Sequence, residues 1–163
     1  MHVEAIAMEG PVHSSTLDAL SARIGSEIGV SAWQAIDQSM VDTFARVTGD
    51  HHFIHVDSAR AAKVLSSGGT IAHGFFTLSL LSNMAYQVCP TIEGVRYPLN
   101  YGFNRLRFVA PVPVGSRVRG RFVLKAVDVI DTSQRQIVYD AKVEIEGAPK
   151  PALVAEWLTR IVL

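Results

Sequence analysis

The sequence predicts an α+β fold in which one long antiparallel sheet wraps around a single buried helix. One observation is a segment between Lys63 and Glu93 that contains no Asp, Glu, Lys or Arg. The other is the C-terminal part of the chain, which alternates between apolar and polar residues in stretches separated by short turns. At 163 residues the chain suits one domain over residues 1–163. Residues 1–13 have no strong period and are expected to form a loose arm.

Short elements are predicted before the uncharged segment. Apolar residues three and four apart predict a helix over residues 16–28, and residues 31–36 indicate a short strand. Asp37 is expected to cap a second helix, which Gly49 ends. A loop rich in histidine follows, after which Ser58 is expected to cap another short helix.

The uncharged segment predicts a helix from about His73 to Val88. Apolar residues occur all round its helical wheel, so it is expected to be buried on every side. Its length of about 24 Å matches the width of a small domain. Pro90 then prevents the helix from continuing.

Four strands are predicted after this helix. They cover residues 101–109, 117–130, 137–146 and 153–163, with a turn at residues 131–134. The third strand alternates apolar and charged residues, which indicates one buried and one solvated face. Successive long strands joined by short turns predict an antiparallel meander.

The composition argues against several classes of protein. Fifteen basic and fifteen acidic residues give no net charge, which disfavours a nucleic-acid partner. Residues 71–89 of the uncharged segment contain six polar residues, which fits a buried helix better than a membrane span. The single cysteine, Cys89, forms no internal disulfide and is interpreted as a small core residue rather than a nucleophile. With no recognisable signal peptide, a cytoplasmic location is expected.

Asp50 and His55 are the candidate acid/base pair. They lie five residues apart across a turn, so their side chains can converge on one point. A carboxylate orients an imidazole that titrates near neutral pH, and a water held by both groups can supply hydroxide and a proton to a double bond. The alternative is structural, with Asp50 capping a turn and His55 partly buried.

Three histidines in this stretch also raise a metal hypothesis. His51, His52 and His55 have a residue type that zinc favours. Adjacent histidines normally point in different directions, and no second metal motif accompanies them. We therefore expect no metal site, and we expect His51 to be exposed at the loop tip.

Three residues of the long helix are candidate site residues. Gly74 lies where the helix begins, so its amide has no intrahelical partner and can stabilise a developing oxyanion. His73 and Ser82 are expected to line the substrate site. In each case the alternative is structural: Gly74 allows close packing, His73 packs in the core, and Ser82 bonds back to a helix carbonyl.

Polar residues on the strands are candidates for carrier binding. We expect Asn104, which opens a strand with Arg105 and Arg107, to contact substrate. A row formed by Arg117, Arg119 and Arg121 could meet the phosphates of coenzyme A. The alternative for that row is a solvated sheet edge.

The chain resembles the MaoC-like hydratases, the (R)-specific enoyl-CoA hydratase family, and most of all its nodulation protein N-like branch. The resemblance covers nearly the whole chain. Its specific motifs are Thr48-Gly49-Asp50-x-x-x-Ile54-His55-x-Asp57 and, downstream, Ile71-Ala72-His73-Gly74.

The resemblance implies a hotdog fold, usually dimeric, and hydration of a trans-2-enoyl-CoA to the (R)-3-hydroxyacyl-CoA. Asp50 and His55 would hold the catalytic water, the Gly74 amide would polarise the thioester carbonyl, and Ser82 would line the site. No metal or redox cofactor is implied, and coenzyme A enters only as part of the substrate. The expected partners are an acyl-CoA or acyl carrier protein thioester and a second copy of the chain in a homodimer.

The chain departs from the family pattern between the two catalytic residues. Many members have Asn-Pro there, and the nodulation-like branch often has Gln-Trp, whereas this chain has His52-Phe53. Two other functions are therefore kept as alternatives. They are a hotdog acyl-CoA thioesterase and a non-catalytic protein that binds an acyl thioester or lipid signal.

Overall fold

A computed structural model describes residues 14–163, so the arm expected over residues 1–13 lies outside the described part of the chain. The helices are α1 (Leu17–Ser21), α2 (Gln38–Thr48), α3 (Phe53–Val56), α4 (Ser58–Ala61) and α5 (Gly74–Tyr86). The strands are β1 (Ser14–Ser15), β2 (Glu27–Val30), β3 (Gln34–Ala35), β4 (Thr91–Ile92), β5 (Tyr97–Phe108), β6 (Arg117–Val129), β7 (Gln134–Ile145) and β8 (Leu153–Val162).

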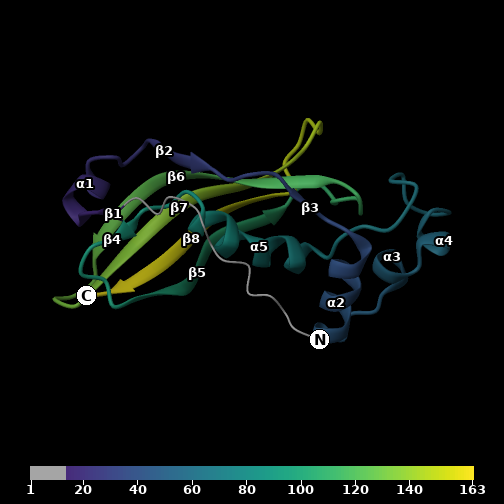
Figure 1. The fold of residues 1–163 in the computed structure, drawn as a ribbon, viewed down its shortest axis with the longest axis horizontal. Coiled ribbons are helices and arrows are strands. Elements are labelled where there is room, and N and C mark those ends of the chain that lie inside the picture. The colour runs from purple at the N-terminus through teal and green to yellow at the C-terminus, as the bar shows by residue number, and fades with distance from the viewer. Residues whose placement is uncertain (1–13) are drawn as a thin grey trace.

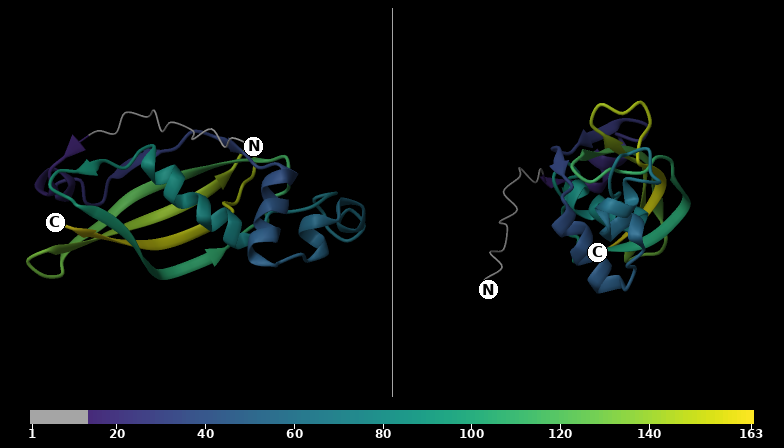
Figure 2. Two further views of the ribbon diagram at one scale, coloured as in Figure 1. Left: turned by 60° about the horizontal axis from the view of Figure 1, so that its bottom comes forward. Right: turned by 90° about the vertical axis from the view of Figure 1, so that its right-hand side faces the viewer.

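The long strands form one antiparallel sheet that curves around α5 (Figures 1 and 2), which confirms the predicted architecture. The core lies between the helix and the sheet, where α5 and the strands bury large apolar side chains against one another. These are Phe76, Leu81 and Met84 from α5 and Phe122, Leu124 and Trp157 from the strands. Burial of this apolar surface is the main force that holds the helix in the sheet.

The predicted meander is correct for three strands and wrong for the fourth. β6, β7 and β8 are sequential neighbours, but the sheet order is β2-β6-β7-β8-β5, so β5 pairs with β8 rather than with β6. The connection over residues 109–116 contains Pro111 and Pro113 and crosses the end of the sheet instead of closing a hairpin. This crossing places residues 109–112 beside the beginning of α5.

The expectation that α5 is buried on every side is wrong for one face. Phe75 is 67% exposed and Tyr86 is 51% exposed, because the sheet covers only the opposite side of the helix. β5 lies at the edge of the sheet and exposes most of its side chains, including Tyr101 and Phe103. Together the outer face of α5 and β5 form an apolar surface, which we call the open face.

The short N-terminal elements differ from the prediction. The helix expected over residues 16–28 ends at Ser21, and residues 27–30 form β2, which pairs with β6. Gly25, with φ of 86°, adopts a left-handed conformation that ends the helical path. Pairing with β6 then decides the conformation of residues 27–30, which local periodicity cannot reveal.

Two boundaries near the histidine stretch also change. Of the strand expected over residues 31–36, only Gln34–Ala35 pairs with a neighbour. The helix expected after Ser58 instead includes Ser58, because the Asp57 carboxylate accepts a hydrogen bond from the Arg60 amide at 2.9 Å and acts as the cap. α2 agrees with the prediction, with Asp37 as its N-cap and Gly49 at φ of 78° as its C-cap.

We expect Gly120→Ala to destabilise the protein by about 1–3 kcal/mol, because a Cβ at this position overpacks the core. That atom would lie 2.8 Å from the Phe122 ring and 2.9 Å from the Cβ of Met84. Gly102→Ala is the matched control, because a Cβ there meets no atom within 4 Å. Urea unfolding of both variants checks the prediction, and equal stabilities would contradict the packing described here.

Candidate active site

Asp50 is positioned by the end of α2. The left-handed Gly49 stops the helix, and its amide donates to the Ala45 carbonyl. The chain therefore leaves α2 abruptly, with Asp50 as the next residue. Its carboxylate is exposed and accepts a long hydrogen bond, 3.3 Å, from the amide of His52.

His55 lies in the single turn of α3 and is buried, with 8% of its surface exposed. Its Nδ1 lies 2.8 Å from the Ile71 carbonyl oxygen, so Nδ1–H donates and Nε2 keeps its lone pair. Burial lowers the pKa of His55 below the usual 6.5, against the opposing effects of the Ile71 hydrogen bond and the Asp50 carboxylate. The ring is therefore neutral at pH 7 and can accept a proton at Nε2.

His73 supports both members of this pair. Its ring stacks on the His55 ring with centroids 3.8 Å apart, and its Nε2–H donates to the backbone carbonyl of Asp50 at 3.0 Å. Only 2% of His73 is exposed, and its Nδ1 has no hydrogen-bond partner among the described residues. These contacts make His73 a positioning residue rather than the expected site-lining residue.

We expect His73→Leu to lower kcat/KM of the activity proposed below by about 10²-fold, because displacements of about 1 Å at a catalytic group have effects of this size. Leu removes the donor to Asp50 and the face that stacks on His55. His73→Gln keeps an amide donor and should recover part of the activity. If both variants fold and both match the wild type in steady-state kinetics, the positioning role is wrong.

Of the three histidines considered as metal ligands, only His55 belongs to the side-chain cluster that the structure forms. Ligand atoms of Asp50, His55 and His73 lie within 4.8 Å of one another, whereas His51 and His52 are exposed. The His55 and His73 rings are stacked at an interplanar angle of 26°, and one ring nitrogen of each already binds a backbone carbonyl. This geometry favours acid/base chemistry, and the absence of a metal stays a prediction.

A hollow of about 320 Å³ joins His55 to the beginning of α5. Gly74 is the first residue of α5, and its amide has no intrahelical partner. A Cβ at Gly74 would lie 3.1 Å from the Phe108 ring, so the glycine keeps the backbone accessible beside that ring. The hollow is lined by His55, Ile71, Ala72, Gly74, Thr77, Phe108–Val112 and Ala152.

Ser82 and Asn104, two of the predicted substrate-binding residues, do not line this hollow. Ser82 accepts a hydrogen bond from Asn100 at 3.2 Å and lines a second cavity farther along α5. Asn104 lies on β5, where its side-chain amide donates to the Glu156 carboxylate. Phe108, Thr77 and the crossing segment take part instead, and no spacing in the sequence indicated them.

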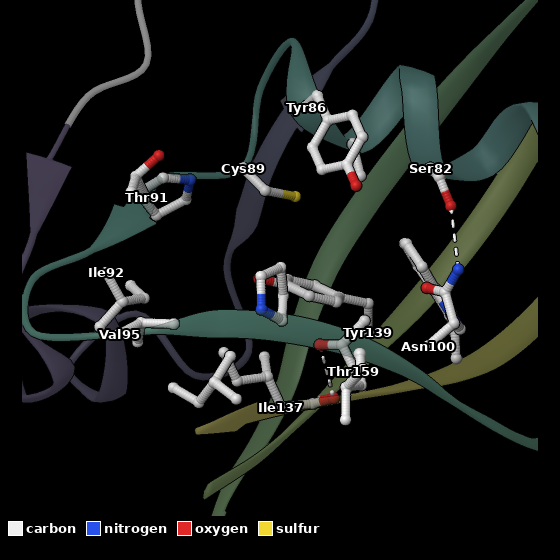
Figure 3. Close-up of a pocket in the computed structure, with 16 residues that line it drawn as sticks. Ser82, Tyr86, Cys89, Thr91, Ile92, Val95, Asn100, Ile137, Tyr139 and Thr159 are labelled. Atoms are coloured by element: carbon white, nitrogen blue, oxygen red, sulfur yellow. Dashed lines mark hydrogen bonds between the residues drawn. The ribbon is translucent and has the colours of Figure 1, made fainter. Parts of the chain in front are cut away.

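The second cavity holds about 390 Å³ between the C-terminal half of α5, β5 and the sheet (Figure 3). Its polar groups are largely satisfied: Ser82 pairs with Asn100, and the Thr159 hydroxyl donates to the Ile137 carbonyl at 3.4 Å. Burial raises the pKa of the Cys89 thiol to about 12, so this thiol is protonated and is not a nucleophile. The remaining lining is mainly apolar, with hydroxyl groups on Tyr86, Thr91 and Tyr139, which suits a hydrocarbon ligand.

The arginine row on β6 does not offer three unpaired cations. Arg117 pairs with Glu146 at 3.0 Å, while Arg119 and Arg121 both bind Glu144, at 2.7 and 2.8 Å. These pairs hold the pKa of the Glu144 carboxyl below its usual range. The three arginines that were considered for phosphate binding are therefore already paired with glutamate carboxylates.

The fold and the site together define a hotdog-fold protein with an acid/base pair at the beginning of its central helix. A family model described as "MaoC like domain" matches residues 19–146. The chain belongs to the MaoC-like dehydratase family, which supports a hydro-lyase activity.

Sequence relatives agree with this family assignment, and a solved structure shares the fold. The chain is 49% identical to nodulation protein N of Rhizobium leguminosarum bv. viciae over 92% of this chain and 93% of that protein. It is 48% identical to 3-hydroxyacyl-thioester dehydratase Z of Mycobacterium tuberculosis over 88% of this chain and 93% of that protein. An (R)-hydratase from A. caviae involved in PHA biosynthesis shares the fold, with a TM-score of 0.65, 24% identity, and coverage of 83% of this chain and 94% of that one.

Proposed function

We propose that the protein is an (R)-specific enoyl-CoA hydratase, which adds water across the trans-2 double bond of an enoyl thioester. The observation that carries the proposal is the Asp50–His55 pair beside the hollow in which the Gly74 amide begins α5. The name of the dehydratase relative, which refers to 3-hydroxyacyl thioesters, supports the same substrate class in the reverse direction. The (R) configuration is carried over from the family resemblance.

The geometry supports a single water held between the two side chains. The Asp50 carboxylate accepts a hydrogen bond from one O–H of this water, whose hydrogen stays on the oxygen. The neutral His55 Nε2 takes the other hydrogen as a proton while the oxygen bonds to C3. The electron pair of the double bond moves toward the thioester carbonyl and forms an enolate. His55 Nε2–H then returns its proton to C2, so the net change is the addition of one water.

The amide of Gly74 stabilises the enolate oxygen. It belongs to the first turn of a thirteen-residue helix, whose dipole favours negative charge at that end. A preorganised donor of this kind acts where charge develops in the transition state. The thioester carbonyl would therefore face Gly74, with C2 and C3 toward the acid/base pair.

The second cavity suits the acyl tail. Ser82 lies about 12 Å beyond Gly74 along the helix axis, so a chain that starts at the hollow and follows α5 reaches this cavity. Its apolar lining and satisfied polar groups favour an unsubstituted hydrocarbon chain. Ser82 would thus line the acyl path rather than contact the reacting atoms.

A second copy of the chain is proposed to cover the open face. β5 is an edge strand with unpaired backbone groups on one side, and edges of this kind pair readily with another strand. Phe75 of α5 and Phe108 of β5 contact each other, with ring centroids 5.7 Å apart, and are 67% and 46% exposed, which is unusual for aromatic side chains. A homodimer paired through β5 would bury both features.

Among residues 14–163, no helix has the length and apolar character needed to cross a membrane.

The proposal is tested by incubating the purified protein with crotonyl-CoA and longer trans-2-enoyl-CoAs. We expect the ultraviolet absorbance of the enoyl thioester to fall without release of free thiol. Thiol release with no change in the enoyl band would identify a thioesterase instead. Tight binding of these thioesters without turnover of any would identify a non-catalytic binder. No added metal or redox cofactor should be needed, which is checked by assays in the presence of a chelator.

The pH dependence of hydration follows from the environment of His55. The reaction needs neutral His55, and the pKa of this group lies below 6.5. As pH falls, kcat/KM should therefore keep more than half of its plateau value at pH 6.5 and reach half only at a more acidic pH. A pH–rate profile checks this, and a midpoint above 6.5 would contradict a neutral His55 base.

A further inference from the structure

A third hollow lies on the outer face of the sheet, where the connection between β7 and β8 projects near β3 (Figure 1). It holds about 370 Å³ between Trp33, the outward side chains of β6 and β7, and residues 147–151. This hollow shares no lining residue with the site described above.

The hollow is rich in positive charge. Arg119, Lys142 and Lys150 line it, with Glu144 as the single lining carboxylate, and Glu144 is shared between Arg119 and Arg121. Neither lysine forms an ion pair with any residue of the range 14–163. Lys142 also lies directly opposite Arg121 in the β6–β7 ladder. Arg121 is paired with Glu144 and Glu27, so the charge of Lys142 is the one left uncompensated at this position.

Trp33 gives the hollow an aromatic wall. The Arg119 guanidinium lies 4.4 Å from the centroid of the Trp33 ring, and Trp33 is half-buried. Aromatic rings and guanidinium planes stack on nucleobases, and ammonium groups bind phosphates. An aromatic wall beside two lysines therefore suits a phosphorylated nucleotide better than a simple carboxylate.

The hollow adjoins the catalytic hollow through the chain itself. Pro151 lines the outer hollow, and the next residue, Ala152, lines the catalytic one, so their Cα atoms are about 3.8 Å apart. The two hollows thus lie on opposite faces of the same end of the sheet. A ligand that occupied both would need a long flexible arm to pass around this end.

We propose that the outer hollow binds the phosphorylated adenosine end of coenzyme A, with phosphates at Lys142 and Lys150 and the base against Trp33. The inference rests on the proposed function, since it assigns the carrier of the same substrate. It selects coenzyme A over acyl carrier protein, which carries no adenosine.

The first test is a calorimetric titration with adenosine 3′,5′-bisphosphate, which needs no turnover. The Lys142→Gln/Lys150→Gln double variant should bind at least about tenfold more weakly, because two charged hydrogen bonds to phosphate are lost. Trp33→Leu should weaken the bisphosphate but not inorganic pyrophosphate. Lys63→Gln, which removes an exposed lysine outside the hollow, is the control and should bind normally. Wild-type affinity in the double variant would overturn the proposal.

The second test compares crotonyl-CoA with crotonyl-pantetheine, which lacks the nucleotide. In the double variant, KM for crotonyl-CoA should rise about tenfold, while kcat and KM for crotonyl-pantetheine stay unchanged. An equal rise for both thioesters, or a rise only for a crotonyl acyl carrier protein, would overturn the assignment. If neither thioester is hydrated but the bisphosphate binds through the lysines, the proposed function fails while the nucleotide site stands.

Discussion

Asp50→Asn and His55→Gln are each expected to slow hydration of crotonyl-CoA by about 10²–10⁴-fold, the range typical for loss of a general acid/base group. Asn keeps the size of Asp50 but removes the charge that orients the water and stabilises the imidazolium. Gln at position 55 can still donate to the Ile71 carbonyl but cannot accept and return a proton. Steady-state rates of the purified variants check the prediction.

Stability measurements separate loss of chemistry from loss of fold. Asp50 is exposed, so Asp50→Asn should unfold near the wild-type temperature. His51→Gln is the matched control, since His51 is an exposed neighbour that the mechanism does not use. Full activity in Asp50→Asn and His55→Gln would remove the basis of the proposed mechanism.

Gly74→Pro is expected to lower kcat by about 10²–10³-fold, the usual effect of deleting one oxyanion donor. Proline lacks the amide N–H but fits the first position of a helix. The preceding residue, His73, already has φ of −62° and ψ of 140°, a conformation that a following proline favours. Steady-state kinetics and circular dichroism of the variant provide the measurement.

Gly74→Ala is the matched variant for this experiment. It adds the same Cβ next to the Phe108 ring but keeps the amide. A large loss in Gly74→Pro together with a small loss in Gly74→Ala indicates that the N–H acts on the reaction. Equal losses would mean that Gly74 serves only close packing, the alternative that the sequence left open.

Local patterns predicted the elements whose sequence matches their final environment. α2 carries its own capping residues, Asp37 and Gly49, and β7 alternates because one of its faces is solvated. The partner of β5 was not predictable in this way, since strand order depends on how residues 109–116 cross the sheet. The exposed face of α5 was not predicted, because an apolar residue can lie either in the core or on an exposed apolar surface, and the sequence looks the same in both cases.

The candidate site was only partly predictable for the same reason. Asp50, His55 and Gly74 belong to short motifs; the structure brings His55 and Gly74 to one hollow and places the Asp50 carboxylate within 4.8 Å of His55. Ser82 lines a cavity farther along α5 than the hollow at Gly74, and the side chain of Asn104 binds the Glu156 carboxylate. Residue spacing in the sequence reveals neither of these placements. The support that His73 gives to the Asp50 carbonyl also requires the three-dimensional contact.

The most direct test of the central claim is product analysis after the reaction of crotonyl-CoA in deuterium oxide. Hydration by His55 and Asp50 predicts (R)-3-hydroxybutyryl-CoA with one deuteron at C2, added on the same face as the hydroxyl. This single face follows because one imidazole returns the proton beside the bound water. Free coenzyme A with crotonate, an (S) product, or deuterium on the opposite face would contradict the account.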